Sequence, residues 1–261
     1  MHHLVVGCGY VGTELARRLR DDGDDVTAVS RSGVDVEGVD SVEADVLGSG
    51  LDLPDVDRAY YLVSSDERGD ADAYRRAYVD GQRRVLEALS DDVDYLYASS
   101  TGVYGPGDGS WVDEETPLDV DAPWREVMVD AERLALDAGG TVVRFAGLYG
   151  PGRLSPDRYL DGATVKSGYL NLLHRDDAAS AAVAALDGER SLYVAVDDEP
   201  VHRHALARWL AEQTGREVGE LVDETARSNR RCSNRRLRSE GWRPVYPSYR
   251  EGFADALDLP V

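Results

Sequence analysis

The chain of 261 residues carries 50 aspartates and glutamates against 29 lysines and arginines, which gives a net charge of −21. Because 42% of its residues are hydrophobic, it can nevertheless bury a full core. Nucleic-acid partners are excluded because the acidic chain has no basic stripe, and membrane partners because no apolar run reaches membrane-spanning length. The two cysteines, Cys8 and Cys232, give no disulfide framework.

The first predicted element leads into a glycine-rich turn. Residues 4–6 predict a short buried strand and residues 13–19 a helix, and the glycines between them have GxGxxG spacing. Gly7 permits the tight turn, Gly9 lets the backbone approach a pyrophosphate, and Gly12 lets the helix pack close to the strand. The helix N-terminus attracts phosphate, so we predict a nucleotide site here rather than a turn alone. Its residues are Gly7, Cys8, Gly9, Tyr10, Val11 and Gly12.

The second strand, predicted at 26–31, determines the choice of cofactor. Its end lies about 20 residues beyond the glycines, where a dinucleotide fold contacts the adenine ribose. An NAD site would place an acidic residue there, whereas this chain has Ser30, Arg31 and Ser32. A guanidinium suits a 2′-phosphate, so NADP is predicted and NAD is the alternative. The other interpretation of Arg31 is a surface arginine.

The following elements predict a doubly wound parallel sheet. A third strand ends at Asp45 and Val46, which we place beside the adenine, and a fourth ends at Val63 and Ser64, which join the same site. Apolar pattern gives this fourth strand the range 59–64 and predicts two further elements, a helix at 74–89 and a strand at 95–100. Alternating strands and helices predict an α/β Rossmann-type fold with helices on both faces of the sheet.

Three later segments resemble a known family. They are Ser-Ser-Thr-Gly-Val-Tyr-Gly at 99–105, Arg-Phe-Ala-Gly-Leu-Tyr-Gly-Pro-Gly-Arg at 144–153 and Asn-Leu-Leu-His-Arg-Asp-Asp at 171–177. In this order they are similar to the extended short-chain dehydrogenases/reductases, the NAD-dependent epimerase/dehydratase group. Val6 occupies the place of the first glycine in the family's usual pattern, so the chain looks like an atypical branch.

The resemblance implies a catalytic group that this chain lacks. Members transfer hydride with a Tyr-x-x-x-Lys pair, in which the ammonium lowers the pKa of the phenol and the phenol shuttles a proton, helped by a serine or threonine. Matching the chain to that pattern puts Trp124 in the tyrosine place and Met128 in the lysine place. Neither side chain can exchange a proton. Ser100 matches the helper hydroxyl and is the predicted catalytic residue, polarising the reacting oxygen.

Three interpretations of this departure stay open. Another acid replaces the pair, with Tyr104, Tyr149, Tyr169 and Lys166 as candidates; or the protein binds NADP(H) without turnover, as a sensor or regulatory protein; or Trp124 and Met128 form a packing pair. No cluster of His, Cys and carboxylates has metal-ligand spacing, so no metal is assigned.

The C-terminal part predicts a small substrate lobe. A helix is predicted at 178–186 with Asp176 and Asp177 as its caps, then a strand at 191–196 and a helix at 204–214. Leu206, Trp209 and Leu210 are its expected buried face. We expect one chain unit, with a cofactor-binding core at about 1–149 and 171–198 and a lobe at about 150–170 and 199–261.

An arginine-rich run lies within this lobe. Its members are Arg227, Arg230, Arg231, Arg235, Arg236 and Arg238. They either balance the surrounding acids or grip a phosphate or carboxylate, since guanidinium binds both through paired hydrogen bonds.

These patterns predict an NADP(H)-binding atypical oxidoreductase or epimerase/dehydratase that acts on a hydroxyl or carbonyl of a small molecule, with a nucleotide sugar as one candidate. The alternative is a non-catalytic NAD(P)(H)-binding protein. Lys166 is the only lysine, and an acidic, lysine-poor chain is typical of cytoplasmic proteins of salt-loving microbes. We therefore expect a cytoplasmic, halophilic protein that is unstable in low salt, because salt screens its self-repulsion. The oligomeric state is open, with a homodimer as one alternative.

Overall fold

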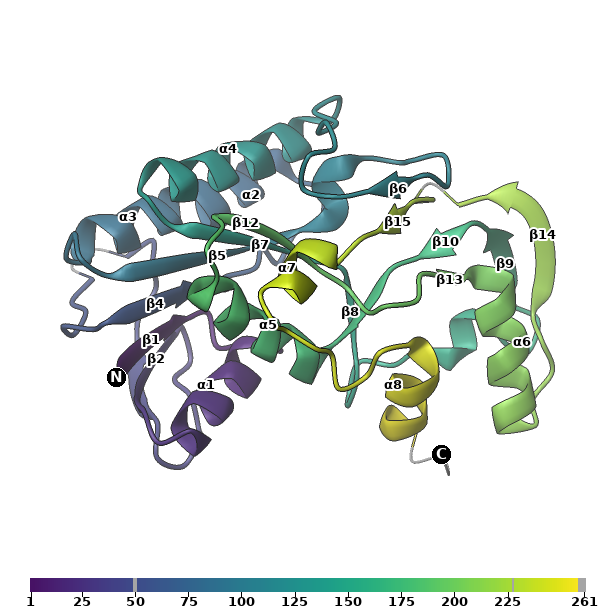
Figure 1. Cartoon of the computed structure of the whole chain (residues 1–261), viewed down its shortest axis with the longest axis horizontal. Helices are drawn as coiled ribbons and strands as arrows, with labels where there is room; N and C mark the ends of the chain where they lie inside the picture. The colour runs from purple at the N-terminus through teal and green to yellow at the C-terminus, as the bar shows by residue number, and fades with distance from the viewer. Residues whose placement is uncertain (49–50, 227, 258–261) are drawn as a thin grey trace.

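The chain folds around a seven-stranded parallel sheet in the computed structural model, which describes residues 1–48, 51–226 and 228–257. The strands lie in the order β12-β7-β5-β4-β1-β2-β3, and each neighbouring pair in this sheet is parallel. Their bounds are β1 (His2–Val6), β2 (Asp25–Ser30), β3 (Asp40–Glu43), β4 (Arg58–Tyr61), β5 (Asp94–Ser100), β7 (Thr141–Phe145) and β12 (Leu192–Ala195). With helices on both faces (Figure 1), this order confirms the predicted Rossmann-type fold.

Three strands end before the site residues that the sequence placed at their ends. β2, β3 and β4 stop at Ser30, Glu43 and Tyr61. The residues in the loops that follow are Arg31, Ser32, Asp45, Val46, Val63 and Ser64. Loops at the carboxyl ends of parallel strands are where open α/β sheets bind ligands.

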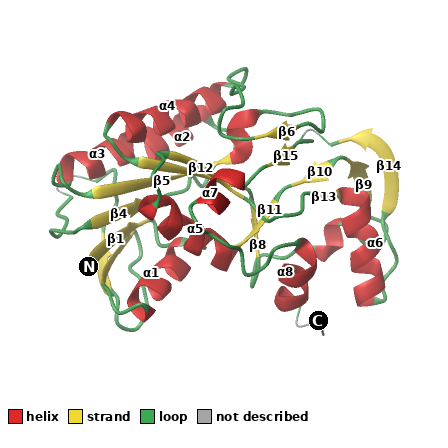
Figure 2. Ribbon diagram, in the orientation of Figure 1, coloured by secondary structure: helices red, strands yellow, loops and turns green. Residues whose placement is uncertain are grey.

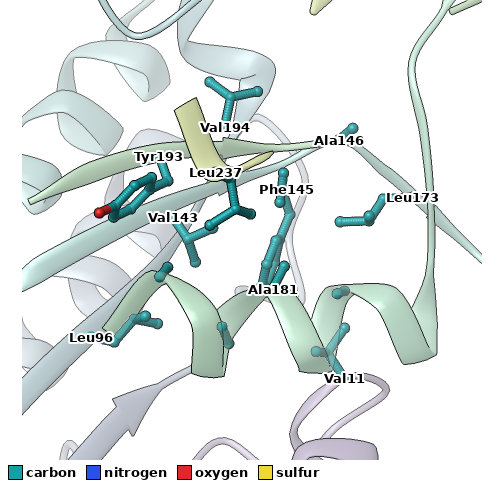
Figure 3. Packing of buried hydrophobic residues seen from close by; sticks show 14 of the residues in the cluster. Val11, Leu96, Val143, Phe145, Ala146, Leu173, Ala181, Tyr193, Val194 and Leu237 are labelled. Carbon is teal, nitrogen blue, oxygen red and sulfur yellow. The ribbon is translucent and has the colours of Figure 1, made fainter. Parts of the chain in front are cut away.

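Helices cover the two faces of the sheet. One face carries α1 (Gly12–Asp21), α5 (Arg175–Asp187) and the short α7 (Arg235–Ser239). Figure 3 shows Leu96, Val143 and Phe145 of the sheet packed over α5, around Ala181. The other face carries α4 (Pro123–Asp137) and a continuous helical segment in which α2 (Ala71–Tyr74) passes through a π-helical turn at Arg75–Asp80 into α3 (Gly81–Ala88). The regular helix predicted at 74–89 is therefore corrected to this segment.

The predicted caps of α5 are wrong. The helix begins at Arg175, and the Nδ1 of His174 accepts the N–H of Asp176 at 3.3 Å. Asp177 is buried, and its carboxylate accepts the backbone N–H groups of Val245 and Tyr246 at 2.7 and 2.9 Å. It therefore anchors the C-terminal segment and does not cap its own helix.

A histidine also caps α6 (Arg203–Thr214), where the Nδ1 of His202 accepts the N–H of His204. In this helix Leu206 and Leu210 are buried as predicted. Ala207 takes the third buried place, whereas Trp209 is half-buried and lies edge-on to Tyr249.

Four small two-stranded sheets lie beyond the carboxyl ends of the main sheet, to the right in Figure 2. They pair β6 (Trp111–Val112) with β15 (Arg231–Cys232), β8 (Gly147–Tyr149) with β11 (Leu172–His174), β9 (Thr164–Ser167) with β14 (Glu220–Thr225), and β10 (Tyr169–Leu170) with β13 (Val201–His202). Beside them, α6 and α8 (Tyr249–Ala256) enclose a separate apolar cluster. Within the described ranges no helix is long and apolar enough to cross a membrane.

A buried ion pair ties α4 to the sheet. The guanidinium of Arg144 on β7 donates to both carboxylate oxygens of Glu132 on α4, at 2.9 and 2.6 Å. The hydroxyl of Ser99 on β5 donates to the same carboxylate at 2.6 Å, and all three side chains are buried. Removing one partner of such a pair leaves an uncompensated buried charge.

We expect Glu132→Ala to lower the free energy of unfolding by about 3–5 kcal/mol, because it strands the Arg144 charge. The matched control is Asp130→Ala on the same helix, which breaks the partly exposed Arg75–Asp130 pair and should cost less than about 1 kcal/mol. Urea unfolding in molar KCl measures both. Equal losses in the two variants would contradict the assignment.

Candidate functional site

One cavity of about 890 Å³ runs along the carboxyl edge of the parallel sheet. Every residue predicted for the cofactor site lines it: Gly7, Cys8, Gly9, Tyr10, Val11, Gly12, Ser30, Arg31, Ser32, Asp45, Val46, Val63 and Ser64. The predicted catalytic Ser100 lines the same cavity. The volume is typical of small-molecule and cofactor sites.

The fold has no room for a Cβ at two glycines of the turn, whereas the third has open space beside it. Gly7 has φ +95°, and a Cβ there would lie 2.6 Å from the backbone N of Val63. A Cβ on Gly12 would lie 2.4 Å from the carbonyl oxygen of Gly7. A Cβ on Gly9 would meet nothing within 4 Å. Packing thus explains Gly7 and Gly12, whereas at Gly9 the cavity has an open floor that suits a closely approaching pyrophosphate.

Helix α1 presents its N-terminus to this turn. Val11 holds the cap position and makes no side-chain hydrogen bond to the first turn. The Thr13 N–H donates to the carbonyl of Gly9 at 3.0 Å. The other N–H groups of that turn can bind an anion, and the helix dipole favours negative charge there.

The far end of the glycine turn opens to the residues after β2. Arg31 is 68% exposed and pairs with the 74% exposed Asp66 at 3.0 Å, across the mouth of the cavity. The Ser30 hydroxyl donates to the carbonyl of Gly33 at 2.7 Å, which holds this loop. An exposed pair of this kind is weak, so the guanidinium can exchange partners at little cost.

Ser100 stands at the opposite end, where β5 meets a short 3₁₀ turn at Thr101–Tyr104. Its Oγ accepts the N–H of Gly102 at 3.1 Å, which leaves the hydroxyl hydrogen to donate into the cavity. Met128 on α4 forms part of the wall here. Trp124, one helical turn earlier, lies 3.9 Å from where a Gly102 Cβ would be, and its ring is stacked by Arg125 and met edge-on by Tyr74.

The four candidates for a replacement acid lie outside the residues that line this cavity. Tyr104 donates to the carbonyl of Asp113 and accepts from Arg144, and burial raises its pKa. Tyr149 is buried in the cluster beside α8, and burial raises its pKa too. Lys166 pairs with Glu224 at the edge of β9, and Tyr169 lies against Arg231.

The structure brings two further phenols to the cavity, Tyr78 and Tyr97. The hydroxyl oxygen of Tyr78 accepts the N–H of Ser65 at 3.2 Å, and burial raises the pKa of both phenols, so both are neutral donors. Burial also raises the pKa of the Cys8 thiol, to about 12. Sequence reasoning missed the tyrosines because each lies within a regular apolar pattern that reads as core.

The arginine run separates into different roles. Arg236 pairs with Glu114 and Glu115, and Arg238 with Asp198. Arg231 lies over the rings of Trp111 and Tyr169. Arg227 falls outside the described residues. Of the described members of the run, Arg230 alone lines the cavity.

Comparisons with known proteins agree with this geometry. The sequence model of the NAD dependent epimerase/dehydratase family matches residues 3–193. A "3-diazoavenalumate denitrifying reductase" from a Streptomyces species is 30% identical over 97% of this chain and 99% of its own length. A structure described as an NAD-dependent epimerase/dehydratase from Methylobacillus flagellatus is 31% identical, with a TM-score of 0.77 over 98% of this chain and 97% of that one. The UDP-glucuronic acid 4-epimerase of Bacillus cereus, solved with NAD, is 18% identical with a TM-score of 0.82 over 98% and 97%, respectively, and is similar in fold.

The open floor at Gly9 generates a test of the site. We expect Gly9→Ala to fold as stably as the wild type and to bind NADPH at least about tenfold more weakly, because its methyl group occupies the space of the pyrophosphate. Gly12→Ala is the matched control: its methyl group meets backbone, so it should lose about 1–3 kcal/mol of stability. Quenching of protein fluorescence by NADPH and thermal unfolding report the two quantities. A Gly9→Ala variant with wild-type affinity would rule out a dinucleotide on this turn.

Proposed function

The chain belongs to the NAD-dependent epimerase/dehydratase family, within the extended short-chain dehydrogenases/reductases, and we propose that it is an NADP(H)-dependent reductase that reduces a small electrophile without a tyrosine–lysine relay. The observation that carries this proposal is the apolar wall of α4: Met128 faces the cavity where the family's pattern has its lysine. Lys166, the only lysine in the chain, lies in an ion pair outside that cavity.

The residues present fit the cofactor. The turn at 7–12 and the N-terminus of α1 would hold the pyrophosphate, and the loop residues Asp45, Val46, Val63 and Ser64 would flank the adenosine and the ribose. Arg31 would exchange Asp66 for the 2′-phosphate of NADP, which carries more charge than a carboxylate. When bound, the reduced cofactor supplies the hydride.

The missing relay favours reduction over the family's other reactions. Epimerases and dehydratases begin by oxidising a hydroxyl, and a general base must then take its proton. Ser100 cannot serve as that base alone, since its hydroxyl does not ionise near neutral pH. It can donate a hydrogen bond to a heteroatom of the substrate and so hold the electrophilic centre in place.

An aryl diazonium ion is the sharpest probe for such a site. It takes up one hydride, releases N₂ and becomes a neutral arene, so that no proton moves and the charges balance. The Streptomyces relative, named a denitrifying reductase of a diazo compound, supports this class of electrophile.

Two other features belong to the proposal. Residues at about 150–170 and 199–261 would form the substrate lobe over the Ser100 end of the cavity, around the core of 1–149 and 171–198. The acidic, lysine-poor composition supports a protein adapted to a salt-rich cytoplasm, so its assays belong in molar KCl.

The apolar wall of α4 also favours a second candidate, a protein that binds NADP(H) without turnover. The Ser100 hydroxyl distinguishes the two, because a sensor needs no donor at that end of the cavity.

Cofactor choice is tested at Arg31. We expect Arg31→Ala to weaken NADPH binding by at least about tenfold while NADH binding stays within about twofold, since only the 2′-phosphate loses its partner. Asp66→Asn, which frees the guanidinium, should tighten NADPH binding. Fluorescence titration with NADPH and NADH measures the affinities of the wild type and of both variants. An unchanged preference in Arg31→Ala would point to NAD.

Turnover is tested with NADPH deuterated at the transferred position and 4-carboxybenzenediazonium, beside the matching aldehyde, 4-carboxybenzaldehyde. We expect deuterium in the arene from the diazonium ion at a rate well above that for the aldehyde, which needs a proton on its oxygen. Ser100→Ala should slow the transfer by about tenfold, because it removes a hydroxyl oxygen whose second lone pair can face the diazonium cation. A protein-free reaction corrects for background, and tight NADPH binding without transfer to either compound would favour the sensor.

A further inference from the structure

Arg230 is a buried cation at the substrate end of the cavity. It precedes β15, lines the cavity and is 6% exposed. Its guanidinium donates to the carbonyl oxygens of Thr101 and Gly105, the latter through a short contact and the former at 2.8 Å. Its Nε is buried without a hydrogen-bond partner. Of the five guanidinium N–H groups, these bonds account for two.

The two carbonyls fix the guanidinium next to Ser100. Thr101 follows Ser100 directly, and Gly105 follows the short helical turn that the Ser100 hydroxyl caps. Asn171 holds the backbone behind it, since its amide donates to the carbonyl of Arg230 at 2.9 Å and accepts the N–H of Cys232 at 2.7 Å. Hydrogen bonds therefore hold both the guanidinium and the backbone of Arg230 in place.

No carboxylate neutralises this charge among the ion pairs of the described residues. Asp119, which lies against Gly105, is taken by Arg125 at 3.0 Å. The neighbouring Cys232 thiol stays neutral, because burial raises its pKa to about 11. A buried charge without a partner is costly. Of the other described arginines of the run, Arg231, Arg236 and Arg238 have aromatic or acidic partners, and Arg235 is exposed.

We propose that Arg230 binds a carboxylate of the substrate, whose apolar body lies along the wall formed by Phe145, Leu148 and Leu170, toward Ser100. The wall residues line the same cavity and carry no charge. A carboxylate brings one negative charge and two acceptor oxygens, which match one guanidinium with unused donors. A diphosphate brings at least two charges and would need a second buried cation. Arg153, the other lobe arginine on the cavity, is exposed and lies over the Tyr10 ring at the glycine turn.

This inference rests on the proposed function only for the direction in which the substrate lies. The carboxylate site can therefore be tested by measuring binding alone. Protein saturated with NADP⁺ in molar KCl is titrated calorimetrically with cinnamate, with cinnamyl alcohol as its uncharged match, and with UDP. We expect cinnamate to bind at least about tenfold more tightly than cinnamyl alcohol.

Arg230→Gln should remove that preference and leave NADP⁺ affinity within about twofold of the wild type. Arg230→Lys, which retains the charge, should keep part of the preference for cinnamate over cinnamyl alcohol. Arg231→Gln is the matched control: it removes the same charge from the adjacent residue, outside the cavity lining, and should leave cinnamate binding unchanged.

The outcomes separate the two proposals. Equal affinities for cinnamate and cinnamyl alcohol in the wild type, or a preference that survives in Arg230→Gln, overturn the carboxylate site even where NADP⁺ binds normally. Arg230-dependent binding of UDP in preference to cinnamate also overturns it and assigns the cation to a diphosphate. Failure to bind NADP⁺ while cinnamate binding still depends on Arg230 overturns the proposed function and leaves this site standing. Should Arg230→Gln not fold, the wild-type comparison and Arg230→Lys decide.

Discussion

The close approach of two backbones at the end of β1 is the constraint on which the site depends. Gly12 lies against the carbonyl of Gly7, and Gly7 against the backbone of Val63, so neither position has room for a side chain. This contact sets α1 directly on the sheet and directs its N-terminus to the floor of the cavity. Backbone packing alone explains Gly7 and Gly12. It does not explain Gly9, so the open space at Gly9 is the feature of the turn that indicates a ligand. The same packing joins the glycine turn to the loop after β4, so two parts of the cavity lining are held together.

Helix α4 combines firm packing against the sheet with an apolar side chain on the cavity. Glu132 and Arg144 hold α4 against β5 and β7 through a buried ion pair, and Ser99 joins them. Helix α4 is thus firmly positioned, yet it presents Met128 to the cavity. A thioether makes the wall apolar and raises the cost of any charge that forms there. Such a wall suits an electrophile that gains a hydride and becomes neutral, and it opposes a reaction that passes through an alkoxide.

The described arginines of the run differ in burial and in partners. Most of the described arginines of the run are on the surface or stacked on aromatic rings, where they offset part of the charge of the 50 acidic residues. Arg230 differs because it directly precedes β15, beneath the turn at 101–105, where its hydrogen bonds go to carbonyl oxygens. Two adjacent arginines at the start of β15 thus have different surroundings. Arg231 packs outward on Trp111, and Arg230 faces the cavity.

The sequence by itself determined the parallel sheet, the glycine turn and the residues that line the cavity around this turn, because these depend on local pattern: buried strands, a helix start and the conformational demands of glycine. It also showed that no Tyr-x-x-x-Lys spacing occurs, since the one lysine, Lys166, stands four residues after Gly162. The tertiary structure alone decided that Tyr104, Tyr149, Tyr169 and Lys166 lie away from the cavity, that Asp177 anchors a distant segment in place of capping α5, and which arginine of the run is buried. Each of these depends on contacts between residues far apart in the chain. Neither the spacing of residues nor the composition indicates which side chains such contacts bury.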